Sequence, residues 1–129
     1  MDKRRVVISG IGLVTPLGLG QSTNWNNLIS GQSGINFLNS FDASDLSCRI
    51  GGEIPSGPSF EGKLDLNEWL NIKEQRKLDR FIMLGLVAAA EAIKDSNIEF
   101  SNEEVSKKTG VIVGSGIGGL KTISETSIL

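Results

Sequence analysis

The sequence contains no histidine and only one cysteine, Cys48, among its 129 residues. Histidine is the commonest general base and the commonest transition-metal ligand, so its absence weighs against a metal site and against acid–base catalysis by the chain itself. A single cysteine cannot form an internal disulfide framework, which is compatible with a cytoplasmic protein. We therefore expect no metal and a cytoplasmic location.

Long apolar runs and a strong charge imbalance are also missing. No stretch of about 18 consecutive apolar residues is present, so we expect no membrane span. The charged N-terminus lacks the apolar run and the small-residue cleavage site of a signal peptide. With 13 basic and 15 acidic residues the net charge is -2, which gives no overall attraction to nucleic acid or to an acidic membrane. Any basic binding surface must therefore be local.

The first half of the chain has turn residues between short apolar segments. Residues 4–14 read as a strand in which the β-branched run Val6–Ile8 is buried on both faces. Residues 22–30 have a helical apolar stripe that Gly31 ends. Residues 48–54 read as a short edge strand weakened by glycine.

The second half has the most regular pattern. Residues 72–95 read as one helix whose middle is apolar on all sides, which predicts a buried central helix ended by Asn97. A strand at residues 110–113 and a helix from Leu120 follow. This alternation predicts an α/β layered fold with a largely parallel sheet.

The stretch GSGIGGLK near the end of the chain carries glycines at 114, 116 and 119, the spacing of a dinucleotide-binding fingerprint. A phosphate-binding P-loop needs lysine directly after the last glycine, but Leu120 separates Gly119 from Lys121. The dinucleotide interpretation needs an acidic residue about 20 positions later, which the chain does not contain. The alternative is a turn where glycine is required for steric reasons.

A basic cluster is the clearest candidate surface. Lys73, Arg76 and Lys77 are spaced i, i+3 and i+4, so on a helix they share one face. From the residues alone, they are a solvated helix start with Glu74 and Asp79 as local ionic partners. Basic residues near a helix N-terminus are unfavourable against the helix dipole, so they call for another reason.

Five segments together point to a family: RRVVISGIGLVTPLG, GQSGI, FDASD, KEQRKLDRFI and GVIVGSGIGGL. In this order and spacing they resemble the β-ketoacyl-acyl-carrier-protein synthases, thiolase-like condensing enzymes. The resemblance covers essentially the whole chain, and SGIGG and FDASD are similar to the synthase II subtype. It implies that residues 1–129 are the N-terminal portion of a ketoacyl synthase N-terminal domain, with the thiolase-like fold incomplete.

The resemblance also implies site residues and partners. Ile117 would line the acyl pocket, and the glycine loop would not bind a cofactor. Lys73, Arg76 and Lys77 would dock the acidic acyl carrier protein, with Arg80 a weaker candidate. The full-length enzyme would be a homodimer that lengthens acyl chains by decarboxylating Claisen condensation, without nucleic acid or membrane as a partner.

The catalytic groups of the family are not expected in this chain. The family uses a cysteine nucleophile at a helix N-terminus and two histidines, and the cysteine motif follows the glycine loop. Cys48 does not match that motif and is expected to be a packing residue, as are Trp25 and Trp69. Ser115 has no base to activate it. We thus expect no activity from the chain alone. The alternative is a free-standing small α/β domain that binds a nucleotide or a protein.

Overall fold

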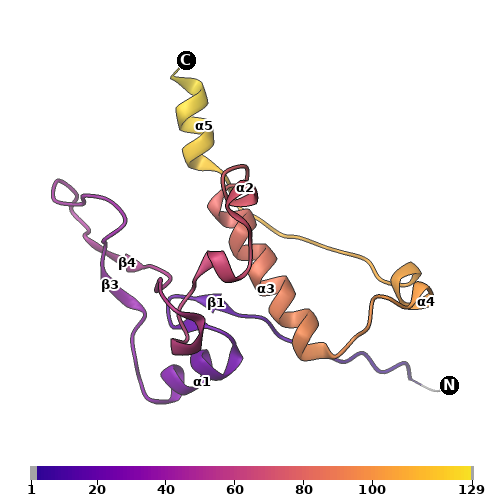
Figure 1. Cartoon of the computed structure of the whole chain (residues 1–129). Helices are drawn as coiled ribbons and strands as arrows, with labels where there is room; N and C mark the ends of the chain where they lie inside the picture. Colours follow the sequence, from indigo (N-terminus) through magenta and orange to yellow (C-terminus); the bar gives the residue numbers. More distant parts are fainter. Residues whose placement is uncertain (1–2, 129) are drawn as a thin grey trace.

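The computed structural model describes residues 3–128 of the chain. Its elements are, in order, β1 (Val14–Thr15), β2 (Gly18–Leu19), α1 (Gln21–Ile29), β3 (Ile35–Phe37), β4 (Ile50–Gly52), the 3-10 turns η1 (Ser59–Glu61) and η2 (Leu66–Glu68), α2 (Ile72–Gln75), α3 (Arg80–Ser96), α4 (Glu103–Lys107) and α5 (Leu120–Ser127). The helix α3 runs through the middle, and the β3–β4 pair, α4 and α5 extend away from it (Figure 1).

The strand predictions are only partly confirmed. The edge strand predicted at 48–54 is present as β4, paired with β3, but only the end of the segment 4–14 is a strand, as β1. Residues 110–113 form no strand. Within residues 3–128 both sheets are two-stranded and antiparallel, so the largely parallel sheet is not confirmed. A strand in a parallel sheet needs a partner strand reached by a crossover connection. Neither residues 4–14 nor residues 110–113 have such a partner in the described chain.

The helix predictions fare better. The helix expected over 22–30 is α1, and Gly31 follows it with a φ of 73°. The single helix expected over 72–95 is two helices, α2 and α3, because Asp79 takes an extended conformation (φ -65°, ψ 151°) that starts a new helix. Asn97 ends α3 in the left-handed conformation, as predicted. No helix in the described part is long and apolar enough to cross a membrane.

One buried polar side chain organises the N-terminal turn. Asn24 of α1 is 6% exposed, and its amide nitrogen donates to the carbonyls of Gly18 (2.9 Å) and Gly20 (2.7 Å). The Thr15 hydroxyl donates to the Asn24 side-chain oxygen. Because unpaired buried polar groups are costly, this set of bonds holds the β1–β2 turn in a single position on α1.

The core is small and lies between this turn and α3. Leu19, Leu64 and Val87 are buried together. Five partly buried side chains pack against them: Val14, Ile54, Leu66, Trp69 and Leu84. The prediction that Trp69 packs is confirmed, and α3 is attached to the first half of the chain through this cluster.

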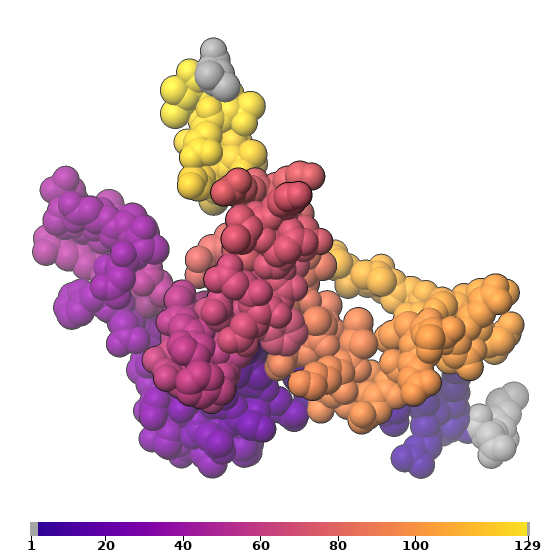
Figure 2. Space-filling view, viewed as in Figure 1, coloured from indigo at the N-terminus to yellow at the C-terminus, as the bar shows by residue number. Residues whose placement is uncertain are grey.

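Two apolar surfaces that the sequence predicts to be buried in the complete fold are exposed within residues 3–128, as the incomplete fold implies. Val6 is 91% exposed, Ile8 82% and Ile112 99%, although all were expected inside a sheet. The middle of α3 is not buried all round either, since Val87 is its only buried residue. Figure 2 shows the cause: the elements project outward and leave open spaces beside α3. Sequence patterns report which surfaces favour burial, whereas actual burial requires a neighbour.

The segment before β1 lies directly against the backbone of α3. A Cβ atom added to Gly12 would come within 1.9 Å of the Ala88 carbonyl oxygen, and one added to Gly10 within 2.2 Å of that of Ala92. The backbone N–H of Ile11 donates to the Asp95 carboxylate at 2.9 Å. Only glycine, which has no Cβ, allows so close an approach to the backbone of α3. We call these contacts the glycine–alanine interlock.

We predict that Gly12→Ala destabilises the chain by about 1–3 kcal/mol, because the added methyl group overlaps the α3 backbone and the helix must move away. Gly85→Ala is the matched control: its Cβ would meet open space, and alanine stabilises a helix relative to glycine by about 0.5–1 kcal/mol. Urea unfolding followed by circular dichroism measures both. Equal stability of the two variants would contradict the interlock.

Candidate functional site

The basic cluster, Lys73, Arg76 and Lys77, lies on a helical turn fixed by its own sequence. The Asn71 side chain accepts from the backbone N–H of Glu74 at 2.9 Å, and the Glu74 carboxylate accepts from that of Asn71 at 3.1 Å. This reciprocal capping fixes the start of α2. The turn continues past α2, since the N–H of Lys77 bonds to the Glu74 carbonyl. All three cationic side chains are exposed.

The cluster has no ionic partner among residues 3–128. The salt bridges found there join other pairs: Lys63–Glu61, Lys107–Glu103, Lys108–Glu104 and Lys121–Glu125. The two acids expected to neutralise the cluster are otherwise engaged, because Glu74 caps α2 and Asp79 accepts a hydrogen bond from Thr122. Three positive charges therefore face solvent on a protein that is slightly acidic overall.

Ile117 lies at the same end of α3. It lines a hollow of about 330 Å³ between the start of α3 and the start of α5. The other lining residues are Asp79, Arg80, Phe81, Leu84, Gly118, Gly119, Leu120 and Lys121. Ile117 is 77% exposed, so the hollow is open on its side. In Figure 1, α2, the start of α3 and the start of α5 meet at one end of the central helix.

The glycine loop has the geometry of a tight turn at its end only. A Cβ on Gly118 would lie 2.5 Å from the Phe81 ring, and Gly119, with a φ of 68°, is the N-cap of α5. Gly114 and Gly116 have open space around them. Residues 110–113, directly before the loop, form no strand, so the strand–turn–helix frame of a nucleotide site is not formed there. The steric explanation therefore holds for Gly118 and Gly119.

Three further residues singled out in the sequence are exposed to solvent: Cys48, Trp25 and Ser115. Cys48 is exposed, and its thiol donates to the Ile50 carbonyl at 3.5 Å, so the expectation that it packs is wrong. Trp25 is 60% exposed, which corrects the same expectation there. Ser115 is exposed. The first two lie on segments whose neighbours in the described structure are too few to bury them.

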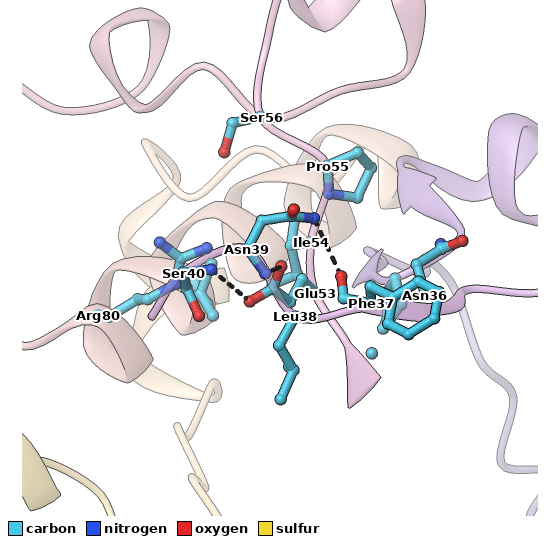
Figure 3. A pocket seen from close by; sticks show the side chains of 13 residues that line it. Asn36, Phe37, Leu38, Asn39, Ser40, Glu53, Ile54, Pro55, Ser56 and Arg80 are labelled. Carbon is cyan, nitrogen blue, oxygen red and sulfur yellow. Dashed lines mark hydrogen bonds between the residues drawn. The ribbon is translucent and has the colours of Figure 1, made fainter. Parts of the chain in front are cut away.

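Sequence patterns gave no sign of a larger hollow, of about 800 Å³, between the β3–β4 pair and α3 (Figure 3). Glu53 lies in it and accepts from the backbone N–H groups of Asn39 (2.9 Å) and Ser40 (3.0 Å). The side-chain hydrogen bond from Ser40, followed by these backbone bonds, lowers the pKa of Glu53. Arg80 lines this hollow and the Ile117 hollow. Only contacts across the fold bring these residues together.

The chain belongs to the β-ketoacyl synthase family, because the sequence profile described as "Beta-ketoacyl synthase, N-terminal domain" matches residues 3–128. A 3-oxoacyl-[acyl-carrier-protein] synthase 2 of Rhizobium meliloti (strain 1021) is 40% identical over 122 residues, 95% of this chain and 29% of the relative. Proteins of the same name from Synechocystis sp. (strain ATCC 27184 / PCC 6803 / Kazusa) and Staphylococcus aureus (strain COL) are 37% and 35% identical, over 97% and 94% of this chain.

The chain spans less than a third of the length of these relatives: 29%, 28% and 27% of the three proteins. The matched part contains both the basic cluster and the Ile117 hollow. The family assignment made from the sequence segments is thereby confirmed.

Proposed function

We propose that residues 3–128 serve as the first part of a 3-oxoacyl-acyl-carrier-protein synthase of the synthase II subtype, with the thiolase-like fold. In that reaction an acyl group moves from its carrier to an enzyme thiol. Malonyl-carrier then loses carbon dioxide, and the resulting carbanion attacks the acyl thioester to release 3-oxoacyl-carrier and the free thiol. This chain contributes carrier docking and one wall of the acyl pocket to the reaction.

The observation that carries the proposal is the basic cluster without acidic partners. Three exposed cations on one turn, with Glu74 and Asp79 engaged elsewhere, produce a local positive field. Such a field increases the association rate of an acidic protein and orients it. An acidic acyl carrier protein fits this charge, and the names of the relatives include it. Without these three cations the rest of the chain has 10 basic and 15 acidic residues, so it is acidic and does not compete for an acidic partner.

The hollow beside Ile117 supports the second part of the proposal. It lies at the end of α3 that also carries the cluster, so a docked carrier would deliver its acyl group close to Ile117. The chain has neither a histidine nor a cysteine at a helix start, so nucleophile and enolate stabilisation are supplied by other residues of the enzyme. The single cysteine fits a cytoplasmic enzyme, and we propose a homodimer for its complete form.

The first prediction concerns turnover. The purified 129-residue chain should not condense acyl-carrier with malonyl-carrier, because the nucleophile is absent. A graft in which residues 3–128 replace the matching segment of the Rhizobium meliloti synthase should do so. Carbon dioxide release measures both proteins. Turnover by the isolated chain that persists in Cys48→Ala, or a folded graft without turnover, would contradict the proposal.

The second prediction concerns docking. Reversing the three charges (Lys73→Glu, Arg76→Glu, Lys77→Glu) should weaken binding of acyl carrier protein to the chain about tenfold or more at low salt, and should flatten the salt dependence of binding. The matched control reverses three lysines that are already paired: Lys63, Lys107 and Lys108. Isothermal titration measures both triple variants. Equal loss in the two would mean that only overall charge matters.

The third prediction concerns the pocket. In the graft, Ile117→Phe should lower kcat/KM for long acyl chains about five- to 150-fold while sparing the shortest, because we expect the rest of the enzyme to close the hollow, and overfilling a closed pocket costs about 1–3 kcal/mol. Ile123→Phe adds the same volume to a half-exposed residue of α5 that does not line the hollow. A uniform decrease across all chain lengths in Ile117→Phe would indicate misfolding instead of pocket contact.

A further inference from the structure

Asp79 occupies the N-cap position of α3 but does not cap it. Its side chain makes no hydrogen bond to the N–H groups of its own helix. It accepts instead from the hydroxyl of Thr122, in α5, at 2.5 Å across 43 residues of sequence. Hydrogen bonds to a carboxylate are among the stronger ones in proteins. A residue placed to start one helix therefore joins that helix to another.

The same carboxylate is packed against the glycine loop. A Cβ on Gly119 would come within 2.6 Å of the second Asp79 oxygen, and one on Gly118 within 2.5 Å of Phe81. The carboxylate thus lies beside the N-terminal ends of two helices, α3 and α5, where both helix dipoles favour a negative charge. We call this set of contacts, Asp79 and Phe81 with Gly118, Gly119 and Thr122, the loop latch.

The latch connects the two parts of the candidate site. Asp79 is two positions after Lys77, the last residue of the basic cluster, and Gly118 is next to Ile117. The rest of the glycine loop has no comparable anchor, since the surroundings of Gly114 and Gly116 are open. The position of Ile117 therefore depends on the contacts at 118–122.

We propose that Asp79 and Thr122 are positioning residues for Ile117. Their hydrogen bond holds the glycine loop against the start of α3 and fixes where the Ile117 side chain meets the acyl group. This inference rests on the proposed role of Ile117 for its functional consequence, whereas the latch itself can be measured without carrier or acyl substrate. The bond is solvent-exposed, so it defines a joint that opens more readily than a buried one.

Three variants isolate the hydroxyl of Thr122. Thr122→Val removes the donor with little change of shape, and Thr122→Ser keeps it. Thr126→Val is the matched control, because the Thr126 hydroxyl donates only to the Thr122 carbonyl within α5. Amide hydrogen exchange of the full 129-residue chain, read by mass spectrometry on a peptide spanning 117–124, reports the opening of the loop and the start of α5.

Thr122→Val should increase exchange in this peptide about fivefold, as expected for loss of one hydrogen bond, with no change in a peptide from α1. Thr122→Ser and Thr126→Val should behave as the parent chain. Equal exchange in Thr122→Val and Thr126→Val, or an unprotected peptide in the parent chain, would overturn the latch. Neither result would bear on carrier docking.

Positioning is tested separately in the graft. Thr122→Val should shift the ratio of kcat/KM for long over short acyl chains about threefold or more, while Thr122→Ser restores the parent ratio and Thr126→Val leaves it unchanged. If the bond were purely structural, Thr122→Val would lower kcat/KM equally for acyl chains of all lengths. This result would overturn the positioning role. If the graft itself has no turnover, the proposed function fails, and the exchange experiment still decides whether the latch exists.

Discussion

The arrangement of this molecule depends on one close contact between two stretches of backbone. Gly10 and Gly12 let the N-terminal segment approach the carbonyls of Ala88 and Ala92 without a side chain between them. The segment enters β1 directly afterwards, so its position also sets those of the β1–β2 turn and of α1. A larger side chain at Gly12 would move all of these elements together relative to α3.

The helix α3 also joins the small core through Val87, and its start lies beside the candidate site. The helix therefore acts as a rigid support with different contacts along its length: the interlock at Ala88 and Ala92, the core at Val87, and the latch at Asp79. Because α3 is a rigid helix, the contacts along it fix the position of the basic cluster and of Ile117 relative to the N-terminal half of the chain.

Local sequence signals predicted the elements that local forces determine. The glycine after α1 and the left-handed Asn97 after α3 were predicted because helix termination depends on the conformational freedom of one residue. The break before α3 was not predicted, because a continuous helical pattern does not reveal that Asp79 is extended. The exposure of Val6 and Ile112 does not follow from their apolar patterns, because burial depends on neighbours that the described chain does not place there.

The site was partly predictable for the same reason. The spacing of Lys73, Arg76 and Lys77 places them on one turn, which the structure reproduces. Their lack of ionic partners could not be predicted, because it depends on Glu74 turning back to cap α2 and on Asp79 bonding 43 residues away. Sequence proximity suggested ion pairs, but competing hydrogen bonds to the backbone and to Thr122 engage these acids instead.

The central claim is that the start of α3 is the end of the molecule that receives an acidic carrier. Titrating the isotope-labelled chain with acyl carrier protein while recording amide NMR signals tests it most directly. The account predicts that the largest shifts fall on residues 71–80 and 117–122 and diminish as salt is added. Shifts centred on α4 or on the β3–β4 pair, or no shifts at low salt, would contradict it.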